Sequence, residues 1–262
     1  MSPSRRRGLL VALALLGGAA AVQAGVGPDG DPFDSGVWPD LRATYLGGAR
    51  LVHDSAVAVQ VPAFAVDPMN VPVSVRVDPS LGAVQRIVIL VDRNPIRRVL
   101  DFEPMSALPA IDLRFKLEQA SPVRAAALLA DGSWHVGSAY VDSAGGGCTV
   151  AGSTRQDGSW SQTLGRVSAR LFPREGQTTR LRLQLMHPMD TGLVSGIPAF
   201  YVKRLSVQDG AGRELARLAS YEPVSENPVF SFDFASPPAG GVRIVGGDNN
   251  GNRISTAIGP LP

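Results

Sequence analysis

The segment Val71-Pro-Val-Ser-Val-Arg-Val77 places a valine at every second position. Successive side chains of a β-strand point to opposite faces, so this spacing predicts a strand with one buried face. The segment from Ile111 to Leu117 alternates in the same way, which predicts one buried and one solvated face. The apolar run within residues 86–91 is typical of a fully buried strand. These three segments together predict a β-rich fold.

Similar segments lie on both sides of a region without strand character. They cover residues 56–61, 123–130 and 134–141 before it, and 166–172, 179–186, 200–207, 214–218, 229–234, 242–245 and 253–258 after it. Asp131-Gly132 is a hairpin signal, and residues 37–46 predict one short amphipathic helix with Trp38, Leu41, Tyr45 and Leu46 on one side. No long helical period is present. The sequence therefore predicts an all-β protein of two β-sandwiches joined by a Gly-rich loop.

The predicted boundaries follow from composition. Residues 25–142 form the first domain and residues 166–262 form the second. Between them, residues 143–165 are rich in Gly, Ser, Thr and Gln, contain no predicted strand or helix, and are interpreted as a linker.

The first 24 residues have the pattern of an export signal. Ser4-Arg-Arg-Arg7 is a basic start, residues 8–22 are apolar, and Val22-Gln-Ala24 predicts cleavage after Ala24. The apolar stretch is too short for a membrane span, and the adjacent arginines fit either a general secretory or a twin-arginine route. We therefore expect a periplasmic protein. Without the signal, 22 basic residues face 23 acidic ones, so the composition carries no electrostatic footprint for nucleic acid or an anionic membrane.

The chain has one cysteine, Cys148, preceded by Gly145, Gly146 and Gly147. In an oxidising compartment an unpaired cysteine indicates a reactive thiol or an intermolecular disulfide. Three glycines are typical of a flexible tether, and the seven residues after Val141 span about 24 Å when extended. We therefore expect a mobile arm with an accessible thiol. No cation lies near Cys148 in the sequence, so nothing local favours the thiolate, although folding could bring one close.

The histidines offer few chemical roles. His53 and His135 lie beside or within predicted strands and are interpreted as structural. His187 begins the segment His187-Pro-Met-Asp-Thr-Gly192, where Pro188 and Gly192 predict a sharply turned loop whose imidazole bonds the backbone.

Two metal or catalytic alternatives use the same residues. A Cys148–His187 dyad, or a copper site with Met186 and Met189, is conceivable, but neither has persuasive ligand spacing. Asp248-Asn-Asn-Gly251 resembles a calcium loop without its closing acidic ligand and is better explained as a hairpin turn. We therefore assign no metal, no cofactor and no catalytic residue.

Several motifs in order support a family resemblance. They are Val71-Pro-Val73, Asp92-Arg-Asn-Pro95 and the Gly-Gly-Gly-Cys148 motif, then His187-Pro-Met-Asp-Thr-Gly192, Ile197-Pro198, Asn227-Pro228 and Asp248-Asn-Asn-Gly251. In these motifs the chain resembles the SoxYZ thiosulfate-oxidation carrier, in the fused form described as a quinoprotein dehydrogenase-associated SoxYZ-like carrier protein.

The resemblance implies a fold and a role. Both halves would be immunoglobulin-like β-sandwiches that pack together, the first SoxY-like and the second SoxZ-like. Cys148 would sit on a swinging arm and carry sulfur intermediates covalently between periplasmic enzymes, without catalysis of its own. The loop with His187, Met189 and Asp190 would lie beside this site.

The arm departs from the family pattern. Free-standing SoxY ends in Gly-Gly-Cys-Gly-Gly, whereas Cys148 is followed by Thr149-Val150 and a whole second domain, so the arm is anchored at both ends. The cargo therefore stays open, and so does the choice between sulfur-oxidation enzymes and a quinoprotein dehydrogenase system as partners. A dimer linked through Cys148 also stays open.

Three other function classes make different predictions for Cys148. A metal or electron-transfer accessory protein of a quinoprotein dehydrogenase would bring Cys148 close to His187. A structural or adhesive β-sandwich protein would bury the thiol. A hydrolase or thiol enzyme would need a base and an oxyanion motif, and neither is visible in the sequence.

Overall fold

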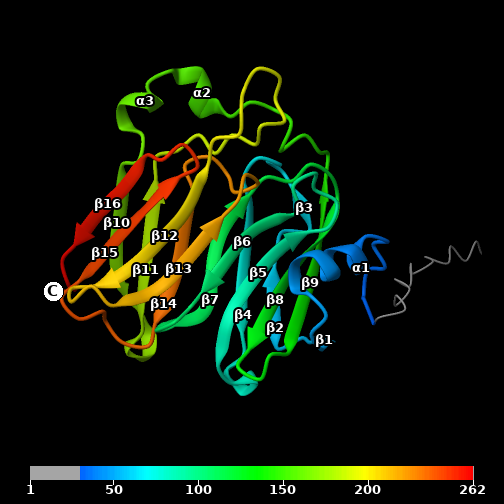
Figure 1. The fold of residues 1–262 in the computed structure, drawn as a ribbon, viewed down its shortest axis with the longest axis horizontal. Coiled ribbons are helices and arrows are strands. Elements are labelled where there is room, and N and C mark those ends of the chain that lie inside the picture. The colour runs from blue at the N-terminus through cyan, green and yellow to red at the C-terminus, as the bar shows by residue number, and fades with distance from the viewer. Residues whose placement is uncertain (1–29, 262) are drawn as a thin grey trace, which may run out of the picture.

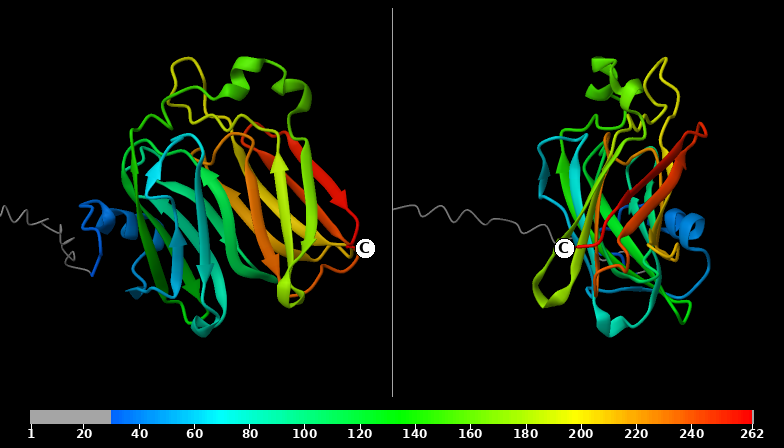
Figure 2. Two further views of the ribbon diagram at one scale, coloured as in Figure 1. Left: turned by 180° about the vertical axis from the view of Figure 1, so that it is seen from behind. Right: turned by 90° about the vertical axis from the view of Figure 1, so that its left-hand side faces the viewer.

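The computed structural model describes residues 30–261, which form two stacked β-sheets. Figure 1 shows the strands of the two halves of the chain side by side, and the edge-on view in Figure 2 shows the two layers. The predicted export signal lies outside the described residues.

The larger sheet has ten strands drawn from both halves. Its order is β1 (Leu51–His53), β9 (Trp134–Ser143), β8 (Ser121–Leu129), β5 (Val84–Val91), β6 (Arg98–Glu103), β13 (Glu214–Ser220), β12 (Val202–Asp209), β15 (Val242–Asp248) and β16 (Arg253–Ile258), and β3 (Phe64–Ala65) also pairs with β9.

The smaller sheet has six strands and crosses the same boundary. Its order is β10 (Val167–Pro173), β11 (Thr179–Leu185), β14 (Val229–Phe234), β7 (Ala107–Phe115), β4 (Val71–Val77) and β2 (Val57–Gln60).

Two antiparallel strand pairs join the halves into continuous sheets. In the larger sheet β6 pairs with β13, with Phe102 opposite Leu218. In the smaller sheet β7 pairs with β14, with Ile111 opposite Phe232. The predicted all-β fold of two immunoglobulin-like sandwiches is confirmed, but the sandwiches merge edge to edge instead of being connected only by a loop.

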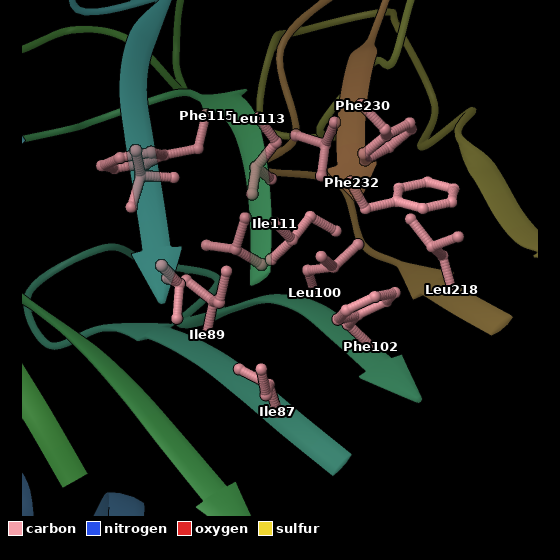
Figure 3. Packing of buried hydrophobic residues seen from close by; sticks show 14 of the residues in the cluster. Ile87, Ile89, Leu100, Phe102, Ile111, Leu113, Phe115, Leu218, Phe230 and Phe232 are labelled. Carbon is pink, nitrogen blue, oxygen red and sulfur yellow. The ribbon is translucent and has the colours of Figure 1, made fainter. Parts of the chain in front are cut away.

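The hydrophobic core is shared by both halves. Figure 3 shows Ile111 and Phe102 of the first half together with Phe232 and Leu218 of the second. The rings of Phe102 and Phe232 lie 5.8 Å apart, so the junction is filled by aromatic packing.

The predicted helix covers the outer face of the larger sheet. The helix α1 (Trp38–Leu41) continues as one π-helical turn over Arg42–Leu46. Trp38, Leu41 and Leu46 are buried against β5, β8 and β9, which explains why residues 87–91 are apolar on both faces.

The strand predictions are confirmed with small shifts of their ends, but the sequence does not predict the short strands β1 and β3, and three further features also differ. Residues 98–103 were not predicted as a strand, yet they form β6 at the junction. Residues 143–165 were expected to contain no element, but they include the short helices α2 (Ser153–Asp157) and α3 (Trp160–Thr163). The alternation over residues 111–117 predicted a solvated Lys116, yet β7 ends at Phe115 and Lys116 is only 3% exposed.

We expect Phe232→Ala to destabilise the whole molecule, because it removes a buried ring from the shared core. The expected loss in the free energy of unfolding is about 3–5 kcal/mol, measured by urea denaturation. Phe172→Ala is the matched control, because Phe172 is 37% exposed, and should change stability little. Two separate unfolding transitions in the wild type would contradict the single shared core.

Candidate functional site

The segment that carries Cys148 turns back along the chain that follows β7. We call residues 144–150 the arm. The backbone N–H groups of Gly146 and Gly147 donate to the carbonyls of Glu118 and Leu117, both at 3.0 Å. The arm is therefore bonded through its backbone to the end of a core strand.

The glycines of the arm are required by this bound geometry. Gly145 and Gly146 have φ angles of +90° and +87°, which L side chains rarely adopt. A Cβ at Gly147 would lie 2.2 Å from the carbonyl oxygen of Pro68 and 2.6 Å from that of Leu117. The sequence predicts a flexible tether at these glycines, but in this structure they permit a close approach between two backbones.

Cys148 is buried where the two halves meet, and only 1% of its surface is exposed. Its N–H donates to Glu118 Oε2 at 2.9 Å, and Thr191 Oγ1 donates to its carbonyl at 2.6 Å. The thiol is directed at the carbonyl of Lys116, with an Sγ–O distance of 3.6 Å. The predicted accessible thiol is therefore wrong for this position of the arm, because residues of both halves enclose it.

We call the enclosing residues the dock: Lys116–Glu118 from the first half and Met189–Thr191 from the second. Asn94 braces its first part, because its side chain donates to the carbonyl of Lys116 at 2.7 Å and accepts from the N–H of Glu118 at 2.8 Å.

The dock disfavours the thiolate. Burial raises the pKa of Cys148 from its ordinary value of 9.0 to about 12. The Glu118 carboxylate adds to this rise, and Lys116 opposes it. Lys116 is thus the cation that folding brings near the cysteine, yet the docked thiol is neutral near pH 7.

Lys116 is itself enclosed by acceptors. Its ammonium donates to the carbonyl of Met189. Burial lowers the pKa of Lys116, while Cys148, Asp190 and Glu226 act in the opposite direction. The positive charge of Lys116 therefore serves to bind the two halves together at the dock.

His187 holds its own loop in shape. The N–H of Met189 donates to His187 Nδ1 at 3.0 Å, and the ring packs on Phe200 with centroids 4.4 Å apart. Its Nε2 lies 3.5 Å from Asp248 Oδ2, and burial lowers the pKa of His187 to about 4. The imidazole bonds the backbone, as the turn interpretation predicts, and is neutral near pH 7.

The remaining loop residues form one wall of the dock. Met189 is fully buried and its sulfur accepts from the N–H of Val202 at 3.3 Å. Asp190 pairs with Arg155 of α2 through contacts of 2.5 and 2.8 Å. The side chains of Cys148 and His187 therefore bond to different partners, and Met189 uses its sulfur within the core.

The other predicted sites are structural. His135 Nδ1 lies 2.7 Å from Asp54 Oδ2 beside β9. Asp248 accepts from the N–H groups of Asn250 and Asn252, both at 2.9 Å, in the β15–β16 hairpin. Over residues 30–261 no group of three or more His, Cys, Asp or Glu side chains is arranged to hold a metal ion.

Two family profiles match the chain. The profile of sulfur oxidation protein SoxY matches residues 42–148, and that of sulphur oxidation protein SoxZ matches residues 169–258. The chain belongs to the fused SoxYZ-like sulfur carriers. Its SoxY half thus ends on Cys148, and its SoxZ half contributes the other wall of the dock.

Two solved structures have weaker similarity. The sulfur carrier protein SoxY from Chlorobium limicola f thiosulfatophilum is 18% identical, with a TM-score of 0.36 over 41% of this chain and 96% of that chain. The exo-chitosanase CsxA of Amycolatopsis orientalis is 12% identical, with a TM-score of 0.22 over 76% of this chain and 26% of that chain. No curated protein sequence matches. Within the described part of the chain, no helix is long and apolar enough to cross a membrane.

Sequence reasoning missed the dock residues Lys116, Glu118 and Thr191. Glu118 lies 30 positions before Cys148 and Thr191 lies 43 positions after it, so no local pattern connects them. The one available signal was Thr191 itself, which belongs to the His-Pro-Met-Asp-Thr-Gly motif.

We expect Gly147→Ala to prevent the arm from docking, because the new Cβ would overlap the Pro68 carbonyl. The alkylation rate of Cys148 by iodoacetamide in the folded protein should rise about tenfold or more. Gly48→Ala is the matched control, since a Cβ there has no neighbour within 4 Å. An unchanged rate in Gly147→Ala would contradict the docked geometry.

We expect acid to weaken the SoxYZ-like fold through His187. The folded-state pKa is about 4, below the ordinary 6.5, so the unfolded chain binds more protons between these values. Stability from this group is complete above pH 6.5 and declines as the pH falls toward 4, by at most about 1.4 kcal/mol per pH unit. Urea unfolding of wild type and His187→Asn from pH 7 to 4.5 tests this. The variant should have the shallower slope, and equal slopes would refute the assignment.

Proposed function

We propose that this protein is a periplasmic carrier that holds a small sulfur-containing group covalently on Cys148 and presents it to partner enzymes. Membership of the SoxYZ-like carriers supports a role in sulfur oxidation. One observation carries the assignment to this residue: the only cysteine of the chain ends the SoxY match and sits on an arm held by polar contacts.

The contacts of the arm suit a segment that docks and leaves. Backbone bonds from Gly146 and Gly147, and side-chain bonds from Glu118 and Thr191, hold it in place. Each such bond contributes about 1 kcal/mol net, because water replaces it on release. Release of the arm therefore breaks only a few hydrogen bonds and leaves the shared core intact.

The two anchors of the arm limit how far the thiol travels. The strand β9 ends at Ser143, five residues before Cys148, and α2 begins at Ser153, five residues after it. Five extended residues span about 17 Å. Ser153 is bound to the Glu226 carboxylate at 2.6 Å, and Ser143 is held in β9, so both sides set a similar limit. A partner enzyme must therefore bring its active site to the dock.

Attachment of a sulfur group to Cys148 is an oxidation. Joining Cys148–SH to a compound HS–R gives Cys148–S–S–R, and both S–H bonds break. Two protons and two electrons leave, and the electrons pass to an electron-accepting partner enzyme. The docked thiol is neutral, so the partner must also supply the base that makes the thiolate.

The remaining parts of the proposal rest on the sequence. The export pattern of residues 1–24 supports the periplasm. Sulfur-oxidation enzymes are the expected partners, and a quinoprotein dehydrogenase system is the other partner class in the proposal. A dimer linked through Cys148 would require a released arm, because the docked sulfur is buried.

The test is intact mass spectrometry, without reductant, of protein isolated from its native periplasm. We expect a defined adduct on the wild type, such as added sulfur or a sulfonate group, and no adduct on Cys148→Ser. A wild-type thiol that is always unmodified and also resists alkylation would refute the carrier function and favour a structural role for Cys148.

A further inference from the structure

We propose that the dock accepts Cys148 only while its side chain is uncharged, so that attachment of an anionic sulfur group releases the arm. This inference rests on the proposed carrier function and adds a rule for when the arm is docked and when it is free. Glu118 is the residue whose charge makes docking depend on the charge of Cys148.

The charged groups at the dock carry a surplus of negative charge. Three carboxylates surround it, from Glu118, Asp190 and Glu226, against the two cations Lys116 and Arg155. Arg155 is paired with Asp190. Lys116 donates to the Met189 carbonyl, and its charge acts on Asp190 and Glu226 as well as on Cys148, so the carboxylates compete with Cys148 for it.

Glu118 is the carboxylate in direct contact with the arm. Its Oε2 accepts from the N–H of Cys148 and its Oε1 accepts from the hydroxyl of Thr149, both at 2.9 Å. Among the residues that the structure describes, Glu118 has no ion pair that would offset its charge. A negative group on Cys148 would therefore lie beside a half-buried carboxylate whose charge no ion pair offsets.

The docked thiol already resists a single negative charge. Burial and Glu118 together raise the pKa of Cys148 from 9.0 to about 12, which disfavours ionisation about a thousandfold. Persulfides and sulfonates are anionic at neutral pH. The same forces would therefore act on a loaded cysteine, whose added group extends the charge beyond Sγ.

As a consequence, the position of the arm depends on whether Cys148 carries an anionic group. The empty thiol stays enclosed, where oxidants do not reach it. The loaded, anionic arm leaves the dock and becomes available to partner enzymes. Hydrolysis of an S-sulfonate restores the neutral thiol, because water gives its hydroxyl to the departing sulfate and its proton to Sγ, and the arm docks again.

The test compares two adducts of nearly equal size that differ by one charge. Iodoacetamide gives the neutral S-carbamidomethyl form of Cys148, and iodoacetate gives the anionic S-carboxymethyl form. Both are made on the full chain in mild denaturant and refolded, with circular dichroism as the check. Hydrogen exchange of the amides of residues 146–148 then reports docking, because these N–H groups make the dock bonds.

We expect exchange of these amides to be about tenfold or more faster in the carboxymethyl form than in the carbamidomethyl form. Glu118→Gln keeps a side chain that can accept the Cys148 N–H but removes the charge, and should narrow this difference. Equal exchange in the two forms would overturn the proposal, whether both arms are docked or both are released by size alone. The proposal would also be overturned if the two forms differed in exchange rate by the same factor in Glu118→Gln as in the wild type.

A second pair avoids alkylation and refolding. Cys148→Asp and Cys148→Asn are nearly isosteric and differ in charge, and Cys148→Ser is the docked reference. We expect fast exchange only in Cys148→Asp, and equal protection in Asp and Asn variants would overturn the proposal. These adducts and variants need no natural cargo, so failure of charge selectivity is distinguishable from failure of the carrier function, which the native mass measurement tests separately.

Discussion

The pairing of β6 with β13 and of β7 with β14 is the constraint on which the rest of the structure depends. These ladders carry both sheets through the SoxY and SoxZ halves, and a shared core fills the space between them. They also position the dock. Just beyond β7, the N–H of Lys116 donates to the carbonyl of Pro223, and the N–H of Ser225 donates to the carbonyl of Arg114. The end of a SoxY strand is thereby fixed against the SoxZ half.

A carrier must protect its thiol between reactions and expose it during them, and these requirements conflict. The dock meets the first requirement by burial, and polar contacts to the backbone of the arm hold the thiol in place. Such contacts exchange readily with water, whereas core packing does not. The glycines serve the docked state, because only a residue without Cβ fits at Gly147.

Much of the fold could be predicted because most strands have one buried and one exposed face. In β11, Leu181, Leu183 and Leu185 alternate with polar side chains, and the period identifies the strand. The strand β6 has no such pattern, since it lies inside a continuous sheet and four of its six residues are buried, including Asp101, which pairs with Arg98. The burial of Lys116 could not be predicted either. The strand ends at Phe115, so the alternation of faces no longer applies at residue 116.

By itself, the sequence determined the β-rich class, the two halves, and the importance of Cys148 with its glycines and of the loop beginning at His187. These are local features, encoded by side-chain periodicity, turn residues and short motifs. Only the tertiary structure decided that the thiol is buried and neutral, and that Lys116, Glu118 and Thr191 surround it. Those residues lie 30 to 43 positions from Cys148, and long-range strand pairing alone brings them together.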